Sequence, residues 1–349
     1  MYSKVTSVNL EITDRCQAAC PMCARNDSGG KEMPHIKNID MSINNVKQWF
    51  PPEWIYSINE FFASGNNGDP VIAKNCLEIF EYLIKHSNPN CRFRIYTNGS
   101  LRTEAWWQKL AKLFGNRGDV VFAIDGFAEQ HSIYRRNTDF DKIIKNATAF
   151  MAAGGHALAN TIVFKHNEHI VDKLKTYLLD MGFEHVEFIF TPRFLGASSY
   201  PVKNNNGEVV YYIEPPTRTK DIAQQVIPIF NKTEIYSLIQ GADIVPQCYK
   251  DLYIDPEGNV YPCSSLHRWC NTKLDQVNTF EEAYKDISID DANSMMNTLG
   301  FINLNGTDIK TALENSNWHQ INKFWEPGKK NTVCVATCSN MGDAFKCIQ

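Results

Sequence analysis

The first half of the chain alternates short apolar runs with longer segments in which apolar residues recur at helical spacing. The six apolar runs, which we predict to be strands, are residues 8–13, 58–63, 93–97, 120–124, 160–164 and 186–190. The segments between them that we predict to be helices are residues 43–50, 76–86, 104–114, 143–153 and 171–181. Strands and helices in alternation predict an α/β fold with a parallel sheet, because each crossover between parallel strands needs a connection as long as a helix.

Polar or glycine-rich residues follow four of these predicted strands. They are residues 64–70, 97–100, 125–126 and 191–193. Ligands of parallel α/β folds bind at the carboxyl ends of the strands. We therefore expect these loops to form one mouth that contains the active site.

The alternation stops after residue 193. Residues 194–247 contain several prolines and the pair Asn206-Gly207 beside an alternating run at 208–214, which predicts a hairpin within a connector or substrate-side insert. Farther on, apolar runs flank a Gly258-Asn259 turn and predict a second, smaller hairpin. We expect three parts, residues 1–193, 194–247 and 248–349.

Composition narrows the class of protein. Apolar residues make up 43% and charged residues 21% of the 349 positions, as in folded globular proteins. Lys and Arg number 35 against 39 Asp and Glu, so we expect no global positive field that would attract nucleic acid. Residues 1–13 lack the regions of a signal peptide, and no apolar run has the length of a spanning helix. We expect a cytoplasmic protein without a membrane or nucleic-acid partner.

Three of the eleven cysteines, Cys16, Cys20 and Cys23, lie within eight residues after the first predicted strand. In a reducing compartment, clustered cysteines indicate a metal site or catalysis more than disulfides. Three thiolates in one short loop can bind three irons of a [4Fe-4S] cluster, whereas closed clusters take four. The spacing therefore predicts a cluster with one open iron. A zinc knuckle is the alternative, and its fourth ligand could be His35.

This cysteine spacing at the first strand-to-loop junction resembles the radical S-adenosylmethionine (SAM) superfamily, and the run Cys-Pro-Met-Cys resembles its members with SPASM or twitch domains. The resemblance implies a partial (β/α)6 TIM-like barrel in residues 1–193. It also implies that the open iron binds SAM. A flavodoxin- or ferredoxin-like donor would then supply the electron that cleaves SAM to methionine and a 5'-deoxyadenosyl radical. The protein would orient the radical and exclude water.

Several loop residues resemble superfamily positions that surround SAM. The resemblance implies that the cofactor-binding residues are Gly65, Gly68, Asp69, Asn98, Asp125 and Arg135. The family usually has a Gly-Gly-Glu-Pro-like run after the second strand, whereas here Asp69 stands in the Glu position and the glycines are separated. Arg135 resembles the arginine that pairs with the SAM carboxylate, for which a guanidinium fork is suited.

A second cysteine pattern, with Gly258 between Cys248 and Cys263, resembles the opening of SPASM and twitch domains. The further Cys-x-x-Cys-x5-Cys run of a full SPASM domain is missing from the sequence. The resemblance therefore implies a smaller, twitch-like iron-sulfur domain at the C-terminal end, with one auxiliary [4Fe-4S] cluster. Its expected ligands are Cys248, Cys263, Cys334 and Cys338, with Cys347 as the main substitute and Cys270 as a less favoured one. If only three of them bind, the open iron could hold substrate.

The predicted function is hydrogen abstraction from an unactivated carbon of a small-molecule or peptide substrate after cleavage of SAM. An auxiliary cluster favours oxidation of the substrate radical, with epimerisation and bond formation as alternatives. Related peptide maturases often carry a peptide-binding extension before the barrel, for which we expect no room before Cys16. The alternative class is a non-catalytic iron-sulfur or zinc binding protein. We expect Cys76, Cys91 and one ring of the Trp106-Trp107 pair to be structural.

Overall fold

The computed structural model describes residues 5–194, 197–217, 250–264, 266–267 and 292–324. The strands of its main sheet are β1 Ser7–Leu10, β2 Glu60–Ala63, β3 Arg92–Thr97, β4 Gly118–Ala123, β5 His156–Ile162, β6 His185–Ile189, β9 Asp251–Ile254, β10 Asn259–Tyr261 and β11 Ile302–Asn303. Their order across the sheet is β11-β10-β9-β1-β2-β3-β4-β5-β6. Strands β1 to β6 are parallel neighbours, so the predicted parallel α/β sheet is confirmed.

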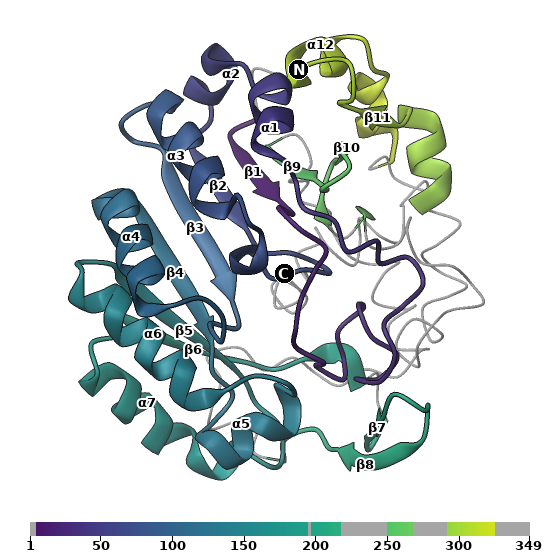
Figure 1. The fold of residues 1–349 in the computed structure, drawn as a ribbon. Coiled ribbons are helices and arrows are strands. Elements are labelled where there is room, and N and C mark those ends of the chain that lie inside the picture. Colours follow the sequence, from purple (N-terminus) through teal and green to yellow (C-terminus); the bar gives the residue numbers. More distant parts are fainter. Residues whose placement is uncertain (1–4, 195–196, 218–249, 265, 268–291, 325–349) are drawn as a thin grey trace.

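Helices cover the outer face of this sheet (Figure 1). They are α1 Ile43–Trp49, α2 Pro52–Tyr56, α3 Cys76–His86, α4 Glu104–Phe114, α5 Ala128–Tyr134, α6 Phe140–Ala152 and α7 Val171–Asp180, and a further helix, α12 Ile309–Glu314, lies near β11. The five predicted helices are all present, and α3 and α4 have the predicted bounds. Helices α2 and α5 were not predicted, because α2 has only five residues and α5 has four consecutive polar residues, 129–132, that interrupt any apolar repeat.

The core between the sheet and the helices is rich in aromatic rings. Phe93 of β3 packs against Phe61 of β2 and Phe80 of α3, and their ring centroids are 6.2 and 6.3 Å apart. Trp107 of α4 is fully buried and packs on Phe122 of β4. The prediction that one ring of the tryptophan pair belongs to the core is confirmed, and Cys76 and Cys91 are both buried as expected.

Strand β1 ends at Leu10, three residues before the predicted end at residue 13. The chain turns away because residues 12 to 14 bond with the segment before α1 instead of with β2. The Ile12 carbonyl accepts from the Met41 N–H at 2.7 Å, and Thr13 forms a bridge with Asp40. This early departure places the cysteine loop at the carboxyl end of the sheet.

Strand β5 begins at His156, four residues before the predicted start. Inward and outward positions alternate along the whole strand, and its first residues pair with β4 through Asp119 and His156. The first four residues of the strand read His-Ala-Leu-Ala, and the sequence prediction placed the start after them, which was wrong.

Two hairpins complete the described structure. Strands β7 Tyr200–Lys203 and β8 Val209–Ile213 form a separate antiparallel sheet, which confirms the hairpin predicted around residues 206–214. The predicted hairpin around Gly258 is also present, as β9 and β10. Strand β9 lies parallel to β1, with Ser7 opposite Asp251, so this hairpin extends the main sheet.

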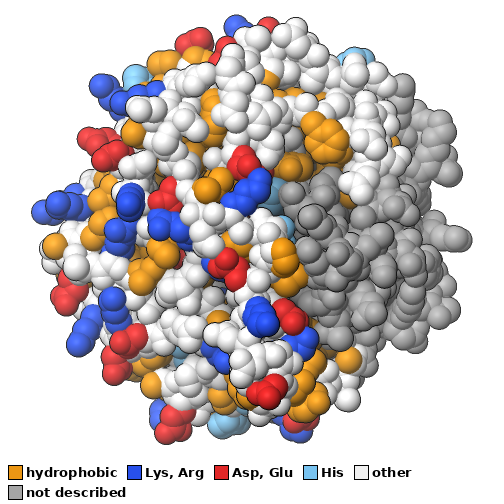
Figure 2. Space-filling view, turned by 45° about the vertical axis from the view of Figure 1, so that its right-hand side comes forward, with side chains coloured by type: hydrophobic (Ala, Val, Ile, Leu, Met, Phe, Trp, Pro, Cys, Tyr) orange, Lys and Arg blue, Asp and Glu red, His pale blue; other side chains and the backbone are white. Residues whose placement is uncertain are grey.

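The described surface carries charges of both signs. On the face shown in Figure 2, Lys and Arg side chains are interspersed with Asp and Glu, as the near balance of the composition predicts. No helix in the part of the chain that the structure describes is long and apolar enough to cross a membrane.

Candidate active site

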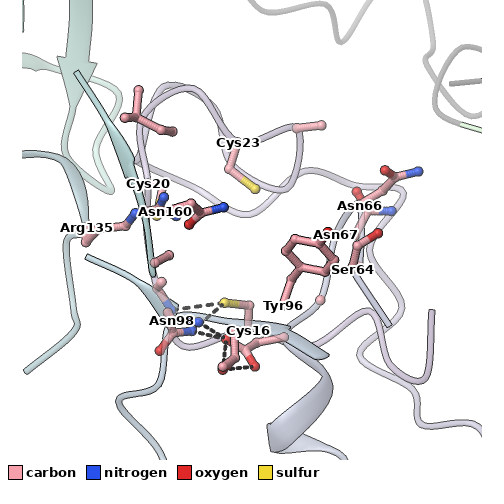
Figure 3. Close-up of a pocket in the computed structure, with 18 of the residues that line it drawn as sticks. Cys16, Cys20, Cys23, Ser64, Asn66, Asn67, Tyr96, Asn98, Arg135 and Asn160 are labelled. Atoms are coloured by element: carbon pink, nitrogen blue, oxygen red, sulfur yellow. Dashed lines mark hydrogen bonds between the residues drawn. The ribbon is translucent and has the colours of Figure 1, made fainter. Parts of the chain in front are cut away.

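The three cysteines of the first motif line one cavity at the carboxyl ends of the parallel strands. Cys16, Cys20 and Cys23 are free thiols on the loop after β1, and they approach the cavity from different sides (Figure 3). Each thiolate of a [4Fe-4S] cluster binds a different iron, so ligands placed around a space suit a cluster. Of the four loops predicted to form the mouth, those after β2, β3 and β6 contribute to the cavity wall, whereas residues 125–126 do not line it.

The β7–β8 hairpin holds the cysteine loop from outside. Tyr200 and Val202 of the hairpin are buried together with Ala18, Cys20 and Met22 of the loop. Within the loop, the Cys23 N–H donates to the Cys20 carbonyl at 3.1 Å. The loop is therefore shaped by an apolar contact as well as by its own backbone.

Burial raises the pKa of two of the three thiols. Burial raises the pKa of Cys20 to about 11, although the neighbouring Arg135 opposes the rise. Burial, the Asp69 carboxylate and the other two cysteines raise the pKa of Cys16 well above its ordinary value. Because protons keep such thiols neutral at pH 7, thiolates here need nearby positive charge, which metal ions supply.

The loop after β2 forms another wall of the cavity and contains the predicted residues Gly65, Gly68 and Asp69. A Cβ on Gly68 would lie 1.8 Å from the Thr13 carbonyl oxygen, so only glycine permits this close approach to the cysteine loop. Gly65 has φ +40°, a backbone conformation that favours glycine. Glycine is thus required at both positions by the backbone itself.

Asp69 is buried, and its carboxylate binds the loop after β3. It accepts from the Thr97 hydroxyl at 2.8 Å and from the Asn98 backbone N–H at 2.7 Å, and the Asn98 side-chain amide also donates to it. Burial raises the pKa of Asp69 against these hydrogen bonds. The Asn98 carbonyl in turn accepts from Gln17 at 2.7 Å, and its amide nitrogen lies 3.7 Å from the Cys16 sulfur. Asp69 and Asn98 therefore connect three loops around the cavity.

The structure also brings the predicted pair Asp125 and Arg135 together. The Arg135 Nε donates to Asp125 Oδ2 at 2.5 Å, and the guanidinium lies over the Tyr134 ring. Arg135 lines the cavity, whereas the fully buried Asp125 lies behind it and also accepts from the Ile162 N–H at 2.6 Å. Asp125 thus orients the arginine.

Several cavity-lining side chains were not named as site residues from the sequence, among them Tyr96, Asn160 and Arg193, the last of which belongs to a loop predicted at the mouth. Arg193 Nη1 donates to the Met22 carbonyl at 2.7 Å, next to Cys23. Each of the three lies at or near the carboxyl end of β3, β5 or β6. Because ligands of parallel α/β folds bind at the carboxyl ends of the strands, this position could have identified these residues in the sequence.

Of the cysteines predicted to bind an auxiliary cluster, the described residues include one. Cys263 follows β10 as a half-buried free thiol, and its sulfur accepts from the Leu266 N–H at 3.4 Å. The other predicted ligands and substitutes lie outside the described residues: Cys248, Cys270, Cys334, Cys338 and Cys347.

Comparison with known proteins identifies a family for the first half of the chain. The sequence signature of the Radical SAM superfamily matches residues 10–178, so this part of the chain is a Radical SAM superfamily domain. It begins at the last residue of β1 and contains β2 to β5, the cysteine loop and most of the cavity wall.

Among curated proteins, the chain is 27% identical over 206 residues to a GTP 3',8-cyclase from Saccharophagus degradans, with 53% of this chain and 54% of that protein covered. The chain thus spans about half the length of the curated relative it matches. Among solved structures, hexahistidine-tagged anSMEcpe with bound AdoMet is similar at a TM-score of 0.54 and 14% identity, covering 99% of this chain and 92% of that chain. Native anSMEcpe with bound AdoMet and the Cp18Cys peptide gives 0.52 and 15%, covering 98% and 95%. At these identities, the solved structures show the shared fold alone.

Proposed function

We propose that this protein is a radical SAM enzyme that binds a [4Fe-4S] cluster through Cys16, Cys20 and Cys23. The observation that carries the proposal is the placement of three free thiols around one cavity at the carboxyl ends of parallel strands. When bound, the cluster and SAM would supply one-electron cleavage of SAM to methionine and a 5'-deoxyadenosyl radical, which abstracts hydrogen from a substrate carbon.

The residues of the chain would bind and orient these groups. Three thiolates leave one iron of a cubane open for the amino and carboxylate groups of SAM. Arg135, held by Asp125, offers a guanidinium in the cavity that suits a carboxylate. We propose that Asp69 acts through the loop after β3, because its oxygens already accept from Val71, Thr97 and Asn98.

The C-terminal part would hold one auxiliary [4Fe-4S] cluster in a twitch-like domain from residue 248 onward. The proposed ligands are Cys248, Cys263, Cys334 and Cys338, with Cys347 or Cys270 as substitutes. The half-buried free thiol of Cys263 beside the main sheet supports a ligand at this position. A second cluster would let the enzyme remove an electron from the substrate radical, which makes it an oxidoreductase.

The proposed substrate is a small molecule or a peptide. The GTP 3',8-cyclase relative supports a nucleotide, and a peptide accompanies AdoMet in one of the similar folds. Two polar side chains of the cavity wall, Asn160 and Arg193, would face such a substrate or SAM itself.

The test is anaerobic reconstitution of the cluster, reduction by flavodoxin or dithionite, and measurement of 5'-deoxyadenosine formed from SAM. We expect turnover by the wild type and none by Cys20→Ala. The matched control is Cys76→Ala, which removes a buried thiol of α3 outside the cavity and should retain turnover. A protein that binds iron but shows no SAM-dependent change in the spectrum of its reduced cluster would be a non-catalytic iron-sulfur protein instead.

A further inference from the structure

The loop after β2 has two sides, and only one of them lines the cavity. Residues 64–69 contribute to the cavity wall. In Figure 3, Ser64, Asn66 and Asn67 lie together on one side of the cavity, opposite Cys20 and Arg135. Hydrogen bonds join this loop to Glu11 and to residues 264 and 267, none of which lines the cavity. These bonds determine how rigidly the cavity wall is held.

Glu11 supplies the first of these bonds. Its backbone N–H continues the pairing of β1 with β9 by donating to the Ile254 carbonyl at 2.9 Å. Its side chain is buried, and Oε1 accepts from the backbone N–H groups of Asn67 at 2.5 Å and Gly68 at 3.0 Å. A buried N–H without an acceptor is destabilising, and here one carboxyl oxygen accepts from two donors of the loop.

Asn66 supplies the second bond, to the segment that follows Cys263. Its side-chain nitrogen donates to the Ser264 carbonyl at 3.0 Å and lies 3.1 Å from His267 Nδ1. Burial lowers the pKa of His267 to about 3, so the ring is neutral. Because Nδ1 accepts from Asn66, the ring proton lies on Nε2, which is 3.9 Å from Asp255 Oδ2.

We propose that Glu11 and Asn66 are positioning residues that fix the loop after β2 for SAM, and that Asn66 couples this loop to the segment carrying Cys263. The proposal rests on the proposed function, since it assumes that SAM occupies the cavity. It goes beyond that function because neither side chain belongs to the cysteine motif or to the predicted cofactor-binding residues. A structural change in the loop on SAM binding would be transmitted to residues 264 and 267 through the side-chain amide of Asn66.

The acceptor role of Glu11 does not require a negative charge. The ionisable groups that face it are Asp14 of its own segment and Asp255 after β9, and both oppose its ionisation. His267 is neutral, and burial also lowers the pKa of His35, which bonds to the Asn67 side chain. A neutral carbonyl oxygen still accepts two N–H groups, so glutamine should replace Glu11 and alanine should not.

The experiment compares Glu11→Ala, Glu11→Gln and Asn66→Ala with the wild type in the reconstituted full chain. It measures the Kd for SAM, the rate of 5'-deoxyadenosine formation at saturating SAM, and hydrogen exchange of the backbone amides in residues 64–70. Glu257→Gln is the control, because Glu257 is an exposed partner of Lys37 in the turn before β10. Iron content and the cluster spectrum report whether the cysteine loop is intact.

For Glu11→Ala we expect a Kd for SAM raised about tenfold or more and faster exchange at Asn67 and Gly68, with unchanged iron content. Glu11→Gln should stay within about threefold of the wild type, which is under 1 kcal/mol. Asn66→Ala should weaken SAM binding and also speed exchange in residues 264–267. The rate at saturating SAM should change less than the Kd in each variant.

Two results would overturn the proposal. One is Glu11→Ala with wild-type exchange or wild-type affinity for SAM, and the other is Glu11→Gln as damaged as Glu11→Ala. If the wild-type protein with its cluster binds no SAM, the proposed function fails together with the role of both residues in SAM binding. The exchange measurement then still decides whether Glu11 fixes the loop.

Discussion

Glu11 is a buried carboxyl group whose protonation affects the stability of the described core. Burial raises its pKa from 4.5 to about 8, against the hydrogen bonds from Asn67 and Gly68. Between these two values the folded state keeps a proton that the unfolded chain releases, so stability falls as pH rises through this window. Glu11 therefore destabilises the fold at neutral and higher pH.

We expect Glu11→Gln to be more stable than the wild type at pH 8, because glutamine has no proton to lose. Each pH unit of this window lowers the free energy of unfolding of the wild type by about 1.4 kcal/mol. The stability advantage of Glu11→Gln should therefore grow by about 2–3 kcal/mol between pH 6 and pH 8 and then level off. Thermal unfolding under anaerobic conditions at several pH values measures it. A stability difference between Glu11→Gln and the wild type that stays constant across these pH values would contradict the prediction.

At the level of single residues, the sequence predicts cluster ligands from their spacing, whereas it does not predict the residues that fix the loops of the cavity. The spacing of Cys16, Cys20 and Cys23 selects them without any structure. Glu11 and Asp69 act through partners that are distant in the chain, such as Gly68 for Glu11 and Asn98 for Asp69. Only the fold brings such partners together, so a motif cannot reveal these roles.

Among the secondary-structure elements, the β7–β8 hairpin matters because it covers the cysteine loop. Val202 is fully buried against this loop, whereas Val210 on the same hairpin is 50% exposed. Substituting each valine in turn therefore distinguishes the loss of the contact with the cysteine loop from a change in the hairpin itself.

We expect Val202→Ala to remove on the order of 2 kcal/mol of packing and to loosen the cysteine loop. Reconstituted protein should then bind less iron per chain and lose its cluster faster under air. Val210→Ala, the matched control, should behave as the wild type. Equal iron content and equal rates of cluster loss in both variants would show that the hairpin does not support the loop.

The sequence predicted elements well where a repeat is long and poorly where it is short. Helix α4 has apolar residues at helical spacing over three turns, and its bounds were predicted as observed. Helix α5 has seven residues and was missed, although its C-terminal end leads directly into Arg135. The early end of β1 was also missed, because the bonds of Thr13 go to Asp40, a partner that periodicity does not reveal.

For the molecule as a whole, the bound cluster should be part of the stability of the fold. The three thiols lie on one loop that packs on the hairpin, and the β2 and β3 loops line the same cavity, so metal bound there would join these parts. A group that binds only the folded state stabilises it by mass action.

We expect anaerobic removal of iron by a chelator to lower the melting temperature of the wild-type protein. Cys20→Ala, which lacks one ligand, should melt near the chelated wild type and should not respond to chelator. Calorimetry measures the melting temperature, and the absorbance of the cluster measures how much of it remains bound. A melting temperature unaffected by iron removal would show that the loop is fixed by the protein alone.

The parallel pairing of β1 with β9 has a consequence for the order in which the protein is made. Strand β1, which leads into the cysteine loop, has β2 on one side and β9 on the other. Its contact between Ser7 and Asp251 can form only after most of the chain has left the ribosome. Such distant contacts slow folding. During most of translation, one edge of β1, the strand that leads to Cys16, is therefore unpaired. It becomes paired only after β9 has been synthesised.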